Sequence, residues 1–388
     1  MDTIQERMQY FADAIDHKEP KKIPCEIEVT GWPLAYGGMT LTEALADPVK
    51  GAEAYSKYLD DVPFDLHVMD AGYMWAPPIY NMLGSDLYTM GSDGVYPVHN
   101  QIGTEFASAE EYDMLLNNYP AYMFDKRVRR LYSIYDLPRE EAYAKLKEAA
   151  LATRNFRLFN AEIERRRLEK GRFQAVAMFA GGPMYRAPLS QICDEIRGLK
   201  ETLVDLRRRP EKVDALIQIL ESMPMPLNPH WADGLPYKIG MTIYHIECFL
   251  NPKQFEKYFW EPFTRQYRPM MEQGVKFLLK GEGSFLNTID YYNDLPDHSM
   301  IFMLEQDDPF EAYKIIGEKH TLIAGAPLEL LQCGTRDECV AYAKKCFDTF
   351  APGGGFIFGN NKPLLGARDA KTENIIAAYQ FADQYSRQ

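Results

Sequence analysis

Short apolar runs rich in β-branched and aromatic residues recur along the chain, separated by longer amphipathic segments. This alternation is typical of repeated strand–helix units built around a parallel sheet. It predicts eight strands, which we place at residues 23–29, 66–70, 173–180, 240–247, 275–280, 300–305, 321–325 and 356–359. Eight such units favour an α/β fold in which the strands close into a (β/α)8 TIM barrel.

The competing architecture is an open, doubly wound sheet, which carries a GxGxxG fingerprint directly after an early strand. The first predicted strand is instead followed by GWPLAYGG, which lacks that spacing. Between residues 107 and 172 the chain turns charge-rich and helical in pattern, without a strand signal. We therefore expect one barrel domain spanning residues 1–388, with a helical insertion at about 107–172.

The composition and charge of the chain limit the binding partners that can be expected. The 388 residues are 46% hydrophobic and carry 43 Lys and Arg against 56 Asp and Glu, a formal charge of −13. This charge repels phosphate backbones and anionic membrane surfaces, so we expect neither nucleic acid nor membrane as a partner. The N-terminal segment lacks the apolar core of a signal peptide, and no run reaches the roughly 18 apolar residues of a spanning helix. We expect a cytoplasmic protein.

Candidate chemistry lies at the ends of the predicted strands, because barrel enzymes place their active sites at the carboxyl ends of their strands. Polar residues stand at most of these ends. The catalytic candidates are Asp70, Lys280, Glu282 and Glu305. The substrate-binding candidates are strand-end polar residues and aromatic residues suited to lining an apolar pocket: Glu28, Tyr73, Trp231, Tyr244, Asn360 and Asn361.

Two short motifs, His245-Ile246-Glu247 and Lys280-Gly281-Glu282, each place two functional side chains at i and i+2. Such residues share one face of a strand, provided that the strand continues that far. An imidazole and two carboxylates suit zinc, which makes Glu282, His245 and Glu247 the candidate metal ligands. The same groups also suit an ion-pair network around Lys280, or carboxyl groups tuned for proton transfer. The residues alone leave these alternatives open.

Longer segments carry a family resemblance. They include RMQYFADAIDHKEPKKIP near the start, GGPMYRA and NPKQFEKYFWEPF in the middle, and IAGAPLELLQCGTRDECVAYAKKC followed by GGGFIFGNNKPLLGARDAKTENIIAAYQF at the end. In order and spacing they resemble the uroporphyrinogen decarboxylase superfamily, which includes cobalamin-dependent methyltransferases on the same barrel. The resemblance covers most of the chain outside the helical insertion.

The decarboxylase branch of that superfamily grips a porphyrinogen with eight carboxylates through an arginine-rich early loop. The first 126 residues here contain one arginine, Arg7. Binding eight carboxylates without those arginines is electrostatically poor. The resemblance therefore favours the methyltransferase branch.

That branch holds zinc through a His-x-Cys motif and a later cysteine, whose positions here read Lys280-Gly281-Glu282 and Gly359-Asn360. Both thiolates are replaced by oxygen or nitrogen donors, which still bind zinc. The resemblance implies a divergent methyltransferase that moves a methyl group between a methoxylated or methylated small molecule and a corrinoid protein, the partner that carries the cobalamin. The alternatives are a cofactor-independent decarboxylase or lyase acting on a smaller carboxylated substrate, and a non-catalytic binding protein.

Overall fold

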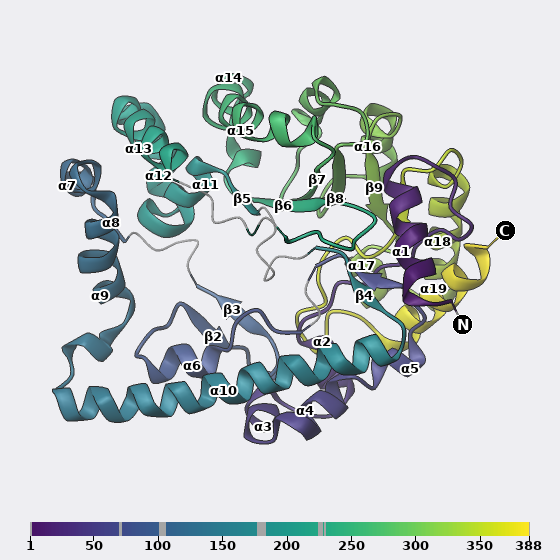
Figure 1. The fold of residues 1–388 in the computed structure, drawn as a ribbon, viewed down its shortest axis with the longest axis horizontal. Coiled ribbons are helices and arrows are strands. Elements are labelled where there is room, and N and C mark those ends of the chain that lie inside the picture. The colour runs from purple at the N-terminus through teal and green to yellow at the C-terminus, as the bar shows by residue number, and fades with distance from the viewer. Residues whose placement is uncertain are drawn as a thin grey trace.

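Parallel strands flanked by helices make up the fold, as the sequence pattern predicts (Figure 1). The computed structural model describes residues 2–69, 72–100, 106–176, 184–223, 228 and 230–387. The strands are β1 (Leu66–His67), β2 (Tyr88–Met90), β3 (Pro97–His99), β4 (Phe173–Gln174), β5 (Met184–Arg186), β6 (Ile239–Tyr244), β7 (Lys276–Gly281), β8 (Met300–Leu304), β9 (Thr321–Ala324) and β10 (Phe356–Phe358).

The helices cover the outside of the strands and form a separate helical region (Figure 1). In the first half of the chain they are α1 (Ile4–Ile15), α2 (Trp32–Tyr36), α3 (Leu41–Ala46), α4 (Pro48–Tyr55), α5 (Tyr58–Asp61), α6 (Pro77–Met82), α7 (Tyr112–Asn117), α8 (Tyr119–Tyr122), α9 (Val128–Leu131), α10 (Arg139–Glu169) and α11 (Pro188–Ile192). In the second half they are α12 (Leu199–Arg208), α13 (Pro210–Ser222), α14 (Pro252–Phe255), α15 (Glu261–Met271), α16 (Pro309–Ile316), α17 (Leu328–Cys333), α18 (Arg336–Phe350) and α19 (Thr372–Tyr385).

Six strands form one parallel sheet in the order β10-β9-β8-β7-β6-β5. Strand β8, with the sequence MIFML, is buried along its whole length. Strands of this kind read as continuous apolar runs because helices cover the faces of parallel sheets. The second half of the chain therefore has short, continuous apolar runs at its strands.

The remaining predicted strands lie side by side in the order in which they occur in the chain. The segment 23–29 bridges to β10 through Cys25 and Phe358, and to β1 through Glu26 and Leu66. Strand β1 pairs in parallel with β4. Among the described residues no strand pairing joins β4 to β5 or β6, and residues 177–183 between them lie outside the described ranges. Closure of the barrel therefore stays a prediction.

The apolar interior lies inside the strands and is separate from the core that packs strands against helices. Alternate strand residues supply it, among them Leu66, Phe173, Met241, Leu278, Ile301, Ile323 and Ile357. Helix α1 covers its amino-terminal end: the Phe11 ring lies 6.1 Å from Phe173 at the start of β4, and 5.1 Å from Tyr237 just before β6. Because α1 fills the amino-terminal end, the polar site is expected at the carboxyl end.

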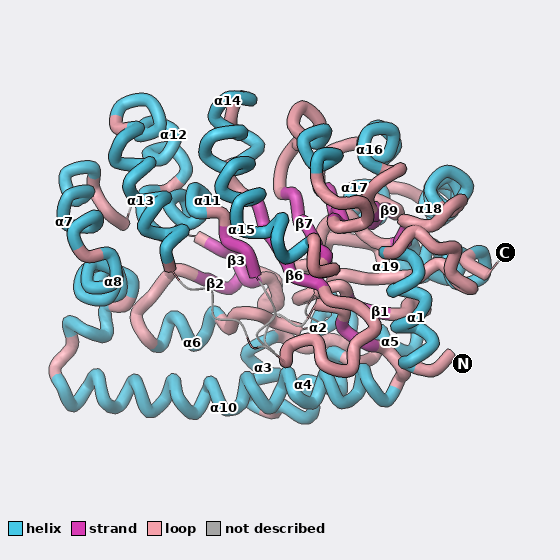
Figure 2. Tube along the Cα trace, turned by 45° about the horizontal axis from the view of Figure 1, so that its top comes forward, coloured by secondary structure: helices cyan, strands magenta, loops and turns pink. Residues whose placement is uncertain are grey.

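The predicted insertion is helical. Residues 107–172 contain α7, α8, α9 and the 31-residue helix α10, and the structure has no strand among them. Helix α10 runs along one edge of the molecule in both Figure 1 and Figure 2. No helix in the described part of the chain combines the length and apolar character needed to cross a bilayer.

Several strands are shorter than predicted, and one hairpin was missed. Strand β6 ends at Tyr244 instead of residue 247, and β1 ends at His67, with Asp70 outside the described residues. Strands β2 and β3 pair antiparallel around a turn at residues 91–96. Three-residue strands are too short for a period-2 pattern to be read.

Replacing Phe11 with Ala tests the role of α1 at the end of the interior. The side chain is fully buried, so we expect Phe11→Ala to lower the free energy of unfolding by about 3–5 kcal/mol. Urea denaturation measures this change. The exposed Gln5 of the same helix provides the control, because Gln5→Ala should leave stability nearly unchanged. Equal stabilities for both variants would contradict the packing described.

Candidate active site

A buried ion pair lies at the carboxyl end of β7. Lys280 Nζ is 2.9 Å from Glu28 Oε1, and each side chain is less than a tenth exposed. Burial opposes the charged form of Lys280, but the charges of Glu28 and Glu282 outweigh it and raise the lysine pKa. The pair therefore holds a fixed ammonium at the carboxyl end of β7.

His245 follows β6 and lies between two carboxylates. Its Nδ1 is 2.6 Å from Asp194 Oδ2, and its Nε2 is 3.4 Å from Glu282 Oε2. Asp194 comes from a π-helical turn, Cys193–Arg197, directly after α11. Burial disfavours the imidazolium, but the hydrogen bonds to Asp194 and Glu282 prevail and raise the pKa of His245 to about 10. At neutral pH this side chain carries a positive charge.

The Glu247 carboxylate is held by Ser190 and by the backbone of His245. The Ser190 hydroxyl donates to both of its carboxylate oxygens, at 2.7 and 2.9 Å, and the His245 amide donates to Oε2 at 3.0 Å. The expectation that His245 and Glu247 share one strand face is wrong, because β6 ends at Tyr244 and Ile246 already has helical backbone angles. Burial raises the pKa of Glu247 to about 7.

Glu305 follows β8 and is the third catalytic candidate near the cluster. Burial, and then the charge of Glu282, raise its pKa to about 7. Lys280, Glu282 and Glu305 are thus electrostatically coupled, as their strand-end positions predict. Asp70, the fourth candidate, lies outside the described residues.

Asn360 and Asn361 direct their amide groups to the backbone of neighbouring strand ends. Asn360 accepts from the Glu28 amide at 2.9 Å and donates to the Glu28 carbonyl at 3.0 Å. Asn361 donates to the Glu305 carbonyl at 2.8 Å and accepts from the Leu328 amide at 2.9 Å. Through these contacts the two asparagines position the backbone of Glu28 and Glu305. A direct contact of Asn360 or Asn361 with substrate remains a prediction.

The three aromatic candidates pack in or against the outer core. The Tyr73 hydroxyl donates to the Val95 carbonyl at 2.7 Å, and the ring is buried in the outer core. Tyr244 also faces the outer core, where it accepts from the Tyr292 hydroxyl at 2.9 Å, because the odd-numbered residues of β6 face the interior. Trp231 is half-buried in the turn before β6.

Sequence reasoning missed Glu26 and Asp194. Glu26 stands two residues before Glu28, so the i, i+2 rule applied to His245 and Glu247 would have found it. Asp194 had no such signal, because a π-helical turn presents it and no local sequence pattern predicts that turn.

The predicted zinc ligands do not converge. Glu282 faces His245, whereas Glu247 is held by Ser190. Among the described residues, no group of three His, Cys, Asp or Glu side chains is placed to hold a metal ion. The donors as arranged do not fit the predicted three-ligand site, and zinc remains a prediction from the sequence.

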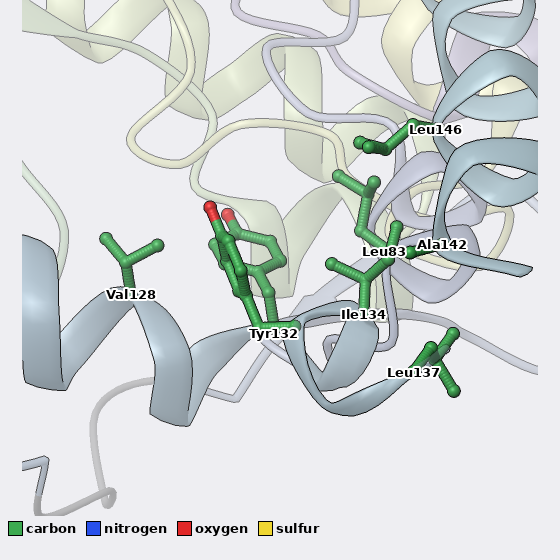
Figure 3. A pocket seen from close by; sticks show the side chains of 8 residues that line it. Leu83, Val128, Tyr132, Ile134, Leu137, Ala142 and Leu146 are labelled. Carbon is green, nitrogen blue, oxygen red and sulfur yellow. The ribbon is translucent and has the colours of Figure 1, made fainter. Parts of the chain in front are cut away.

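An apolar pocket lies in the helical region, away from the strand ends (Figure 3). It is lined by Leu83, Val128, Tyr132, Ile134, Tyr135, Leu137, Ala142 and Leu146. Its tyrosines are its only titratable side chains. The charged cluster, with its perturbed carboxyl groups, is the better candidate for catalysis.

Comparison with known proteins identifies a fold. No protein-family model and no curated protein matches the chain. Among solved structures, a methyltransferase from Methanosarcina mazei matches with a TM-score of 0.55 and 14% sequence identity, over 99% of each chain. At this identity the likeness establishes a shared fold along the whole length.

We expect Glu305→Gln to flatten the pH dependence of stability between about pH 4.5 and 7. In the folded parent the Glu305 pKa is about 7, against an ordinary value of 4.5, so the folded state binds more protons in this window. The contribution of Glu305 to stability is therefore present below about pH 4.5 and is lost as the pH rises towards 7. Urea unfolding of parent and variant at several pH values measures it.

The matched control is Glu256→Gln, because Glu256 is exposed on the outer surface. This variant should keep the pH profile of the parent. If Glu305→Gln also keeps it, Glu305 does not titrate as described.

Proposed function

We propose that this chain is a methyltransferase that moves a methyl group between a methoxylated or methylated small molecule and a corrinoid protein. The observation that carries the proposal is the full-length likeness in fold to a methyltransferase, combined with a cluster of charged groups at the strand ends. We also propose that the eight strands close into a barrel of the uroporphyrinogen decarboxylase type, since their neighbour order suits closure.

In this proposal a corrinoid on the partner protein supplies the cobalt that takes or gives the methyl group. The chain itself has to hold the small molecule and control charge around the group that leaves. Glu305 changes its protonation near neutral pH, so it can donate a proton to a leaving oxygen or present a negative charge. The His245 imidazolium, fixed by Asp194 and Glu282, provides a constant positive charge next to the Glu282 carboxylate.

The decarboxylase alternative has less support. A decarboxylase would need a cation such as Lys280 to hold the substrate carboxylate, and Lys280 is already paired with Glu28. The binding-protein alternative does not explain why two carboxyl groups near the strand ends, Glu247 and Glu305, have pKa values of about 7. Perturbed carboxyl groups of this kind are concentrated at catalytic sites.

The test uses cob(I)alamin and a panel of methoxyaromatics and methylamines. With a suitable donor, the parent protein should convert the corrin absorption spectrum to that of methylcobalamin. Glu282→Gln should slow this conversion about 100-fold or more, because it removes the carboxylate that faces His245.

The surface variant Glu256→Gln should retain the parent rate. A parent protein that causes no corrin change with any donor on a broad panel would count against methyl transfer.

A further inference from the structure

Acidic side chains outnumber basic ones at the strand ends. The described cluster contains the carboxyl groups of Glu26, Glu28, Asp194, Glu282 and Glu305, and the cationic groups of Lys280 and His245. Both cations already have partners: Lys280 pairs with Glu28, and His245 lies between Asp194 and Glu282. Negative charge is therefore left over after internal pairing.

Glu26 is the second observation, because its carboxyl group is fully buried and unpartnered. Neither of its oxygens has a hydrogen-bond partner in the described part of the chain. The amides of Val68 and Asn360 lie close enough to lower its pKa, but outside hydrogen-bond geometry. Burial and the charge of Glu28 nevertheless raise that pKa well above the ordinary value. Buried polar groups without partners are rare and call for an explanation.

The orientation of Glu26 is set by the strand. Ile27 packs in the outer core, so Glu26 and Glu28 face the interior, towards Lys280. A Cβ atom on Gly359 would lie 2.0 Å from Glu26 Oε1, so the absence of a side chain there makes room for the carboxyl group. Oε2 of Glu28, which is 5% exposed, also has no partner among the described residues.

A stack of aromatic rings includes His99, which lies within electrostatic range of Glu282. Tyr88 of β2 stacks on Trp75, with ring centroids 4.9 Å apart, and on His99 of β3 at 4.6 Å. His99 is close enough to Glu282 for its charge to help lower the pKa of that carboxyl group. Carboxylates next to aromatic faces are the surroundings that ammonium groups prefer.

We propose that the methyl-bearing substrate is a cation, an N-methylated ammonium compound whose charged nitrogen lies among Glu28, Glu282 and Glu305. A positive charge there offsets the carboxylate repulsion that the internal pairs leave uncompensated. An anionic substrate would need an unpaired cation, and Lys280 and His245 are both engaged.

The transfer step, which rests on the proposed function, balances without a proton. The N–CH3 bond breaks and its electron pair stays on nitrogen, so a quaternary ammonium departs as a neutral tertiary amine. The partner's cob(I)alamin contributes the electron pair of the new bond to the methyl group. The departing amine is a base, so it takes up a proton only after the transfer, from solvent or from the Glu305 carboxyl group.

Binding of two isosteres tests the proposal, with choline as the cationic probe and 3,3-dimethyl-1-butanol as its neutral carbon analogue. Isothermal titration at pH 8 should show choline binding at least tenfold more tightly. Glu282→Gln and Glu305→Gln should each reduce this ratio severalfold and leave the affinity for the neutral analogue nearly unchanged. Glu256→Gln should preserve the parent ratio, because Glu256 lies on the exposed outer surface.

Equal affinities, a preference for the neutral analogue, or no binding of either probe by the parent would overturn the proposal. The test of the cation site and the test of methyl transfer can give different results. A choline preference without corrin methylation from any donor would support the cation site and count against methyl transfer. Corrin methylation from neutral methoxyaromatics without a choline preference would support methyl transfer and count against the cation site.

Discussion

The ion pair between Lys280 and Glu28 is the interaction on which the arrangement of the site depends. It joins residues 252 positions apart in the sequence and connects the first strand region to the end of β7 across the interior. Towards the amino ends of the strands the interior is lined mainly by apolar side chains, with the buried Glu26 among them, so an unpaired ammonium at this position would carry a large desolvation cost. The pair lies near the change from a packed core to a polar site.

A frame of backbone contacts holds Glu28 in position. Asn360, just after β10, forms two hydrogen bonds with the Glu28 backbone, and the Tyr379 hydroxyl of α19 donates to the Glu26 carbonyl at 2.8 Å. The two ends of the chain therefore build one wall of the site together. An asparagine that uses its whole amide in this way gives the strand end a fixed register, which a precise charge arrangement requires.

The likeness to a known methyltransferase and the chemistry of this cluster are separate matters. A fold shared at 14% identity fixes where the strand ends lie but not which side chains occupy them. In this chain Glu282 and Asn360 stand at two of the strand ends. Glu282 faces His245, and Asn360 holds the backbone of Glu28, so both side chains serve hydrogen bonding and charge.

The sequence by itself determined the parallel strand order, the helical region at 107–172 and the strand-end positions of Lys280, Glu282 and Glu305, because hydrophobic periodicity is a local property. It did not determine the partners of those residues. Asp194 reaches His245 from a turn 51 residues away, Glu247 turns to Ser190 because β6 ends early, and Tyr244 faces outward because its neighbours Ile243 and Met241 face inward. Only the tertiary structure decides such pairings, since they depend on where strands stop and on which distant segment packs beside them.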